Sequence, residues 1–322
     1  MATLVMQALG CEVAALNTVQ FSNHTGYGQF KGTKASAQEI RDLYDGLKQS
    51  YLNDFDVMLT GYIPGAEALD AVGTIARDQK LKSSTKPGSF FWVLDPVMGD
   101  QGQLYVPPAV VPAYKNLLKD ADLILPNQFE ASLLSDTPID DFDSLATALA
   151  TLHTTHHIPH IVVTSISFSA DSPMLAVVGS TARSDGSPRL FRVDVPAIDC
   201  YFSGTGDMFA ALTVVRLREA VCAVPGLSTT RAWVSPDAVD AVDLPLARAV
   251  QMVLGSMHAV LAKTKAARDD ALAGLDAQGV LEREQGSDRR LHLRKTKAAE
   301  IRLVRCLADL REPHVRYEAV PF

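Results

Sequence analysis

Two stretches of the sequence, FFWVLDPVMGD (residues 90–100) and ADLILPNQFEASLL (residues 121–134), decide the fold class. Each contains a short apolar run rich in strand-forming residues and ends at a proline beside a polar residue. The second stretch then passes directly into a helical pattern. Repeated units of a strand followed by a helix predict a mostly parallel sheet with helices on both faces, which is an α/β fold.

The rest of the chain extends this alternation in both directions. Ser36 and Glu39 have the spacing of a capping box, and Gly10 stands where a helix would end. The predicted helices are Thr3–Leu9, Ser36–Tyr51, Glu67–Lys80, Pro108–Lys119, Ser144–His153, Gly206–Leu217 and Pro245–Leu261. The predicted strands are Val13–Val19, Asp56–Thr60, Phe90–Leu94, Asp122–Leu125, Ile161–Val163 and an antiparallel pair, Leu175–Val178 and Leu190–Val195.

Composition excludes several classes of protein. A net charge of −7 argues against a broad nucleic-acid surface, although one cleft can still be locally positive. The four cysteines are scattered and form no C-x-x-C pair, which favours reduced thiols in a cytoplasmic protein. No apolar run reaches the length that crosses a bilayer, and the amino-terminal segment is a poor signal peptide. We therefore expect neither a nucleic-acid nor a membrane partner.

Polar residues follow successive predicted strands at the point where each strand ends. These residues are Asp95, Asn127 and Thr164, and Asp207 stands at the start of a later helix. In parallel sheets, ligands bind outside the carboxyl ends of the strands. The coincidence predicts an active site at that edge.

The sharpest motif is Gly204-Thr205-Gly206-Asp207, which an apolar helix follows at once. Bare N–H groups at a helix start can hold phosphoryl oxygens, and a carboxylate in the first turn could accept a proton from a hydroxyl. An ordinary glycine-rich turn capped by Asp explains this motif about equally well. The sequence contains neither a complete G-x-G-x-x-G fingerprint here nor a Walker A motif.

Two pairs of residues with oxygen-bearing side chains suit a hard cation. Asp95 and Asp100 flank the first turn, whereas Asn127 and Glu130 stand three apart at a predicted helix start. Oxygen ligands of this kind bind Mg²⁺ together with phosphate oxygens. The alternative for each pair is a turn with a capping residue, and their occurrence after successive strands favours the metal interpretation.

Other polar clusters are less specific. The segment Gln20–Tyr27 combines the aromatic Phe21 with short polar side chains such as Thr25, a combination that could bind a substrate with a flat polar ring. From chemistry alone, however, a simple hairpin or turn is the favoured interpretation. Tyr62 could line a pocket or simply pack. The histidines, predicted on an exposed helix end and loop, lack further ligands, so no metal site is expected at His153, His156, His157 and His160.

Residues 263–290 are dense in charged residues, alanine and glycine. Their weak apolar stripe indicates a solvated helix or a flexible insertion. Mixed structure, with a terminal strand and a docking tail, is expected over Leu291–Val320.

Taken in order, the motifs resemble those of the pyridoxal kinase family, within the ribokinase-like superfamily. The matching stretches are QFSNHTGY (20–27), LTGY (59–62), DPVMGD (95–100), Tyr105-Val106-Pro107, ADLILPNQFEASLL (121–134), Val163-Thr164-Ser165 and GTGDMFA (204–210). The similarity runs from about residue 2 to the carboxyl terminus, except for the charged stretch near 264–290. It implies a single kinase domain spanning residues 1–322.

The resemblance also implies a reaction, in which Mg-ATP phosphorylates the 5′-hydroxymethyl group of pyridoxal, pyridoxine or pyridoxamine. Asp207 would be the general base, and Gly204, Thr205 and Gly206 would form the anion hole. Asp95 and Asp100 would face phosphates and cations, and Asn127 and Glu130 would support magnesium. Thr164 and Ser165 would approach the nucleotide; Phe21, Thr25 and Tyr62 would border the vitamin ring; Tyr105 would belong to the mobile segment over the site. A monovalent cation (K⁺ or Na⁺) and a homodimer are further family traits.

Two departures from the family pattern produce expectations of their own. The family begins with another strand and a serine- and glycine-rich loop, so we expect a chain lacking them to fold poorly or to bind pyridoxal weakly. The loop Gln101–Gln103 is short, so the lid should close less completely. The rival interpretations are another ribokinase-like kinase, such as a hydroxymethylpyrimidine kinase, and a catalytically impaired binding paralogue.

Overall fold

A seven-stranded sheet forms the centre of the computed structural model, which describes residues 1–169, 172–278 and 288–322. The strand order is β11-β10-β9-β8-β7-β4-β3, in which β3, β4, β7 and β8 run parallel and the remaining neighbours pair antiparallel. The strands of this sheet are β3 (Val57–Thr60), β4 (Phe91–Leu94), β7 (Leu123–Ile124), β8 (His160–Ile166), β9 (Met174–Ala182), β10 (Pro188–Pro196) and β11 (Val320–Pro321). The predicted α/β class with a mostly parallel centre is confirmed.

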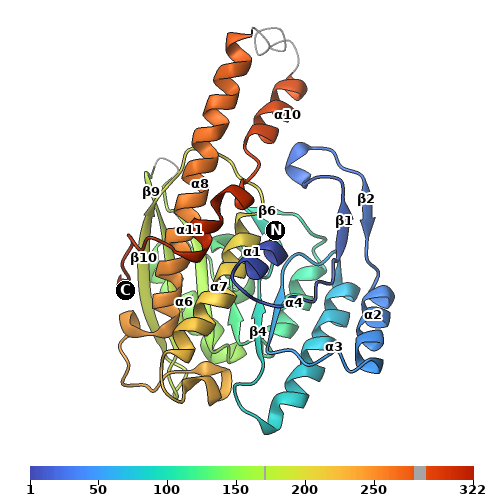
Figure 1. The fold of residues 1–322 in the computed structure, drawn as a ribbon. Coiled ribbons are helices and arrows are strands. Elements are labelled where there is room, and N and C mark those ends of the chain that lie inside the picture. The colour runs from blue at the N-terminus through green and yellow to red at the C-terminus, as the bar shows by residue number, and fades with distance from the viewer. Residues whose placement is uncertain (170–171, 279–287) are drawn as a thin grey trace.

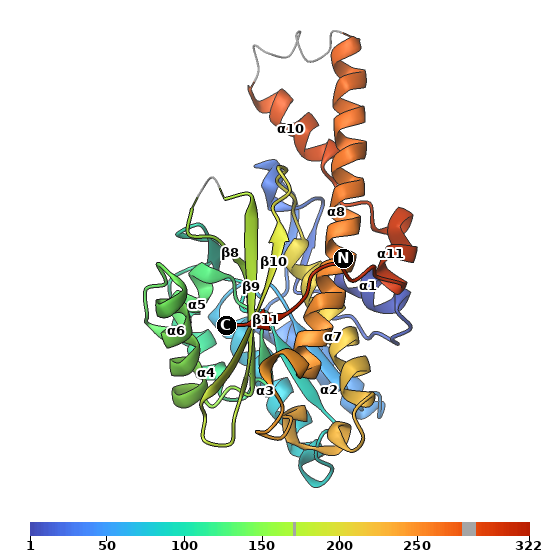
Figure 2. The same ribbon diagram turned by 90° about the vertical axis from the view of Figure 1, so that its left-hand side faces the viewer.

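Helices cover both faces of this sheet, and Figure 2 shows α4–α6 on one side and α7 and α8 on the other. One hydrophobic cluster contains side chains of α2–α6, and a second contains those of α1, α7, α8 and α11. The α-helices are α1 (Ala2–Ala8), α2 (Ala37–Gln49), α3 (Ala66–Lys82), α4 (Val110–Leu118), α5 (Gln128–Ser135), α6 (Phe142–His156), α7 (Thr205–Cys222), α8 (Pro245–Ala277), α10 (Asp288–Ala298) and α11 (Leu307–Arg311). The 3₁₀ helices are η1 (Thr25–Tyr27), η2 (Ser83–Thr85), η3 (Leu227–Thr229), η4 (Arg231–Trp233), η5 (Ala241–Asp243) and η6 (Leu303–Cys306).

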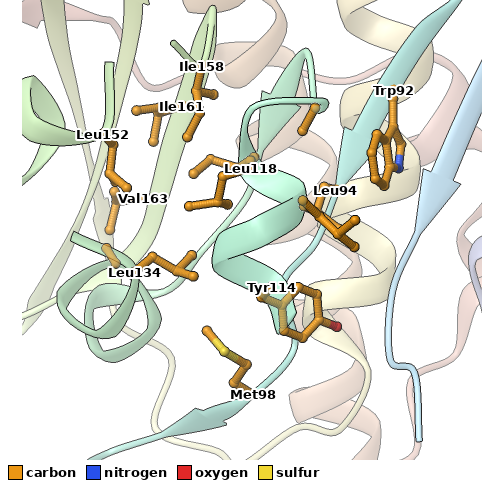
Figure 3. Packing of buried hydrophobic residues seen from close by; sticks show 14 of the residues in the cluster. Trp92, Leu94, Met98, Tyr114, Leu118, Leu134, Leu152, Ile158, Ile161 and Val163 are labelled. Carbon is orange, nitrogen blue, oxygen red and sulfur yellow. The ribbon is translucent and has the colours of Figure 1, made fainter. Parts of the chain in front are cut away.

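Strand β4 is buried on both faces, which explains its continuous apolar run. Trp92 and Leu94 belong to the first cluster, whereas Phe91 and Val93 belong to the second. This alternation is the two-residue period of a strand that is covered on both sides. Figure 3 shows Leu94 of β4 in the first cluster, together with Leu118 of α4 and Val163 of β8.

Two short hairpins lie outside the main sheet. One pairs β1 (Val19–Phe21) with β2 (Gly32–Lys34), and the other pairs β5 (Gly99–Asp100) with β6 (Gln103–Leu104). Gln101 and Gly102 form the turn of the second hairpin with positive φ values of 48° and 76°. Positive φ at both central residues matches the tight turns that connect twisted strands.

Helix α8 extends well past the main body of the molecule, and α10 returns beside it (Figures 1 and 2). The predicted helix Pro245–Leu261 was therefore too short, since α8 continues to Ala277. The expected solvated helix is confirmed as far as Ala277, but residues 279–287 of the predicted insertion lie outside the described residues.

The predicted strand Val13–Val19 is wrong, because residues 11–17 have no regular structure and β1 begins only at Val19. A strand requires a hydrogen-bonded neighbour, and the partner β2 reaches only residues 19–21. The apolar signal came instead from packing, since Leu16 contacts the first hydrophobic cluster.

Candidate active site

The carboxyl edge of the parallel strands gathers most of the predicted site residues. Gly61 follows β3, Asp95 follows β4 and Asn127 follows β7, where it forms an isolated bridge with Thr164 of β8. A methyl group placed on Gly61 would lie 3.6 Å from Asp207 Oδ1, and one placed on Gly206 would lie 3.7 Å from Asp95 Oδ2. The start of α7 therefore lies directly against the ends of these strands.

Helix α7 begins at the glycine-rich motif. Gly204 is the N-cap residue with a φ of 86°, a left-handed conformation that glycine adopts without strain. The first four N–H groups of a helix, counted from the N-cap, have no acceptor within the helix, so those of Gly204, Thr205, Gly206 and Asp207 are available to an anion. Met1 packs against Gly204, since a methyl group on this glycine would lie 2.7 Å from Met1 Cε.

Asp207 lies in the first turn of α7 and remains accessible to solvent. The surrounding protein nevertheless displaces enough water to raise the pKa of its carboxyl group, and the amino terminus partly offsets this shift. A carboxylate with a raised pKa is a better proton acceptor than an ordinary aspartate. The residue thus combines access with basicity.

Asp95 is a buried carboxyl group without a matching cation. Its side chain forms no hydrogen bond or ion pair within the described part of the chain. Burial raises its pKa well above the usual value, and the nearby Glu130 and Asp207 raise it further. A buried, unpaired carboxylate is costly, so this position fits a bound cation or the cation of a nucleotide complex.

Asn127 and Glu130 form the capping box of α5. Asn127 Oδ1 accepts from the Glu130 N–H at 2.9 Å, and Glu130 Oε2 accepts from the Asn127 N–H at 2.9 Å. Glu130 Oε1 also accepts from the N–H groups of Met98 and Gly99, at 2.8 and 3.3 Å. Burial raises the pKa of Glu130 to about 7 despite these bonds. The pair therefore fixes the segment after Asp95 to the start of α5.

Thr164 and Ser165 lie inside β8 rather than after it, which corrects the predicted strand end at Val163. The register between β8 and β9 shifts between Val163 and Ile166, and Ser165 has a φ of 56°. A non-glycine residue in this region of φ costs free energy, and such strain concentrates at functional sites. The bulge leaves Ser165 exposed at the site edge.

The hairpin β5–β6 carries two further predicted residues. Asp100 is exposed and accepts a hydrogen bond from the Gln101 N–H at 2.8 Å. Tyr105 follows β6, and its N–H donates to Met98 O at 2.8 Å. The pKa of the exposed Tyr105 side chain is raised by partial burial, with smaller contributions from Asp100 and Tyr201. These residues thus lie along one rim of the site.

The residues predicted to border a ring are only partly connected to this centre. Tyr62 follows Gly61 and packs on the first hydrophobic cluster. Phe21 packs against Phe30 with ring centroids 4.5 Å apart, and within the described residues no contact joins Phe21 to Asp207. Thr25 lies in η1, whose Gly26 approaches Tyr201. The loop at Thr25 therefore meets the segment that leads into Gly204.

A surface pocket of about 390 Å³ lies between this segment and α8. Its lining residues are Ala197, Ile198, Asp199, Ala262, Lys265, Ala266 and Asp269. No sequence motif marks these residues, so they were not predicted. Their nearness in sequence to Gly204 was the available signal, since Asp199 stands five residues before it.

The opposite end of the sheet carries the histidines. His153 and His160 are buried, so their predicted exposed position is wrong. Ser180 and Ile158 O partner the two ring nitrogens of His153, and Thr181 and Ala232 O partner those of His160. No group of three or more potential ligands that could hold a metal occurs among residues 1–169, 172–278 and 288–322. Another pocket, of about 480 Å³, also lies at this end, beside His157 and Arg183.

A mixed sheet with a parallel centre, a glycine-lined helix start and buried carboxylates at its carboxyl edge defines the ribokinase-like small-molecule kinases. The family model described as phosphomethylpyrimidine kinase matches residues 7–244. A putative pyridoxal kinase of Schizosaccharomyces pombe is 36% identical over 264 residues, which cover 82% of this chain and 79% of the relative. Human pyridoxal kinase is 37% identical over 222 residues, which cover 66% of this chain and 70% of the human protein.

The solved structures agree with the sequence comparisons. The pyridoxal kinase of Leishmania donovani in complex with ADP and pyridoxamine superposes with a TM-score of 0.77 at 28% identity, covering 100% of this chain and 93% of that one. This chain therefore belongs to the phosphomethylpyrimidine kinase family and, within it, to the pyridoxal kinases.

Proposed function

We propose that this chain transfers a phosphoryl group from Mg-ATP to the 5′-hydroxymethyl group of pyridoxal, pyridoxine or pyridoxamine, in vitamin B6 salvage. The carrying observation is the accessible Asp207 carboxylate, with its raised pKa, in the first turn of a helix whose N–H groups lie beside Asp95. The relatives support the substrate, because pyridoxal kinases match most of the chain. We assign the whole of residues 1–322 to one kinase domain.

The reaction requires one proton transfer and one displacement. Asp207 accepts the proton of the substrate hydroxyl while the hydroxyl oxygen forms a bond to the γ-phosphorus. The bond from that phosphorus to the bridging oxygen breaks, and ADP leaves. The N–H groups of Gly204, Thr205 and Gly206 donate to the phosphoryl oxygens as negative charge moves across them. The raised pKa of Asp207 favours the proton transfer.

Magnesium fits the acidic groups at this edge. Asp95 has no side-chain partner among the described residues, and Asp100 is exposed on the neighbouring hairpin. The Glu130 carboxylate accepts three hydrogen bonds from backbone N–H groups. Since an ionised carboxylate has about four lone-pair sites, one site remains for a cation. Asp95, Asp100 and Glu130 would hold the ion with Asn127 in support, and the bound ion would neutralise phosphate charge.

The nucleotide and the vitamin approach from different sides. Thr164 and Ser165 lie at the strand edge, where the phosphates of ATP would bind, and the pocket at Ala197–Asp199 and α8 provides space for the adenine base. Phe21, Thr25 and Tyr62 would border the vitamin ring, with Tyr105 over the site. The family resemblance supports a monovalent cation (K⁺ or Na⁺), a homodimer and a cytoplasmic location. Among the described residues no helix is long and apolar enough to span a membrane.

The decisive experiment measures turnover of pyridoxal with Mg-ATP by the absorbance of the phosphorylated product. We expect Asp207→Asn to lower kcat by at least about a thousandfold with little change in melting temperature, because the carboxylate acts as the base. Binding of the vitamin without turnover by the wild-type chain would instead identify an impaired binding paralogue. A preference for hydroxymethylpyrimidine would identify the other kinase activity of this superfamily.

A further inference from the structure

We define the helical arm as residues 262–277 of α8 together with α10. This arm is distant in sequence from the β1–β2 hairpin, yet it contacts the loop of that hairpin. Figure 1 shows α10 beside the upper end of this hairpin, and α10 contacts both η1 and α8. The loop between β1 and β2 contains η1 and Thr25, the residue proposed to border the vitamin ring. A segment more than 250 residues later in the sequence thus meets the proposed substrate loop, defined as residues 24–29.

Three residues of this carboxyl-terminal region bind the substrate loop. His292 Nε2 donates to Gly26 O at 2.8 Å, and Arg289 donates to the side-chain oxygen of Gln29. Glu300 lies just after α10, and its Oε1 accepts from the Tyr27 hydroxyl at 2.8 Å. The same oxygen lies 3.3 Å from His24 Nε2.

The backbone next to Glu300 is anchored to α8. The backbone N–H of Arg302 donates to Thr264 Oγ1 at 3.3 Å, and the guanidinium of Arg302 donates to Ala267 O at 3.3 Å. The chain next to Glu300 is therefore tied to α8. Burial raises the pKa of Tyr27 to about 12, with a further contribution from Glu300, so its hydroxyl remains a donor throughout the physiological range.

The substrate loop has little else to hold it. Helix η1 contains no buried residue and no side-chain cap. Asn23 ties the loop locally, by donating to Gln29 O at 2.6 Å and to His24 O at 3.1 Å. Tyr201 is a further neighbour, since a methyl group on Gly26 would lie 3.6 Å from its Cε1. A segment without buried apolar anchors depends on such tethers for its conformation.

We infer that Glu300 is a positioning residue, which acts through Tyr27 and His24 to hold the substrate loop in the conformation that receives the vitamin ring. His292 reinforces this tether through Gly26. The inference rests on the proposed function and deepens it, since Glu300 governs vitamin affinity and leaves the chemical step to Asp207. The nucleotide sites at Thr164 and Ser165 have no such contact with Glu300 in the described part of the chain.

Kinetics of matched variants test this inference. We expect Glu300→Ala to raise the KM for pyridoxal about fivefold, with kcat and the KM for ATP changed less than about twofold. Glu300→Gln should lie between this variant and wild type, because its amide oxygen still accepts from Tyr27. Lys297→Ala is the matched control on α10 and should behave as wild type. Equal effects of Glu300→Ala and Lys297→Ala, or a parallel change in the KM for ATP, would overturn the inference.

A double-variant cycle checks the route of the effect. If Glu300 acts through the Tyr27 hydroxyl, adding Tyr27→Phe to Glu300→Ala should raise the KM for pyridoxal by less than Tyr27→Phe does alone. Simple multiplication of the two single effects would contradict the coupling.

Hydrogen exchange separates this inference from the proposed function. Without any substrate, the amides of residues 26–29 should exchange several-fold faster in Glu300→Ala than in Lys297→Ala. Failure of wild-type protein to phosphorylate pyridoxal would defeat the proposed function, while the exchange result would still decide whether Glu300 holds the loop. Identical exchange in the two variants would refute the positioning role.

Discussion

Asp95 and Asp122 are buried carboxyl groups at opposite ends of the same part of the sheet, and their surroundings differ. Asp122 precedes β7 and is fully paired, with Lys80 Nζ at 2.7 Å and the Trp92 N–H at 2.8 Å. Asp95 follows β4, and its pKa is raised by burial and further by Glu130 and Asp207, which carry charge of the same sign. The hydrogen bonds of Asp122 stabilise the fold, whereas the unpaired carboxyl group of Asp95 leaves a charge that a ligand can neutralise.

The histidines extend this contrast. His160 donates through Nε2 to Ala232 O at 2.8 Å and accepts from the Thr181 hydroxyl at 2.9 Å. Burial lowers the pKa of both His153 and His160 to about 4, so each is neutral and fully bonded at neutral pH. The buried groups Asp122, His153 and His160, at the amino end of the parallel strands, therefore have partners, whereas Asp95 at the carboxyl end has none among the described residues. Such a difference marks the carboxyl end as the functional one.

Among the variants that compare the two ends of the sheet, Asp95→Asn has the largest expected effect. Asp95→Asn should lower kcat/KM by between about a hundredfold and a thousandfold, because the carboxylate that faces the cation is lost. The same variant should be more stable than wild type at pH 8 without magnesium, since an unpaired buried charge is removed. Steady-state kinetics and urea unfolding measure the two quantities.

Asp122→Asn is the matched control and should give the reverse result. It should lower the free energy of unfolding by about 2 kcal/mol, because the hydrogen bond from Lys80 to a charged acceptor is replaced by one to a neutral acceptor. Its catalytic constants should stay close to wild type under folding conditions. An equal loss of stability in Asp95→Asn and Asp122→Asn would contradict the proposed difference between the carboxyl and amino ends of the parallel strands.

His160→Phe should also affect stability rather than chemistry. The ring fills most of the vacated space, but Ala232 O and the Thr181 hydroxyl lose their partner. Two unsatisfied buried groups should reduce the free energy of unfolding by roughly 2–3 kcal/mol. Thermal or urea unfolding measures the loss, and a selective change in KM without any loss of stability would contradict the structural role.

The last prediction concerns the pH dependence of stability at Glu130, which is spread over several pH units. Its pKa rises from 4.5 to about 7 on folding, so its contribution to stability is complete below pH 4.5 and is lost as the pH rises through 7. Relative to Glu130→Gln, the wild-type chain should therefore lose up to roughly 3 kcal/mol between pH 4.5 and 8. Urea unfolding of both proteins across this range gives the difference. Parallel pH profiles would show that the carboxyl group does not titrate in this window.

Local patterns predicted the elements whose signals lie in adjacent residues. The spacing of Ser36 and Glu39 predicted a capping box that the structure confirms. The order of apolar runs and prolines predicted β4, β7 and the helices around them. The predicted strand Val13–Val19 failed because its apolar residues pack on the core without a ladder partner, and no local signal distinguishes those two outcomes.

The candidate site likewise has features that the sequence predicted and features that it did not. Its residues could be chosen from the sequence because strand ends and helix starts carry recognisable chemistry, as in Asp95 and Gly204–Asp207. The sequence did not show that Glu130 binds the backbone of Met98 and Gly99, that Asp95 lacks a partner, or that Glu300 reaches Tyr27. Burial and partners far apart in the chain decide these features, because a side chain's desolvation and hydrogen bonds depend on the neighbours that folding brings to it. The sequence by itself therefore determined the order of strands and helices and the chemical groups at their ends, while only the tertiary structure decided which of those groups are paired and which remain open to a ligand.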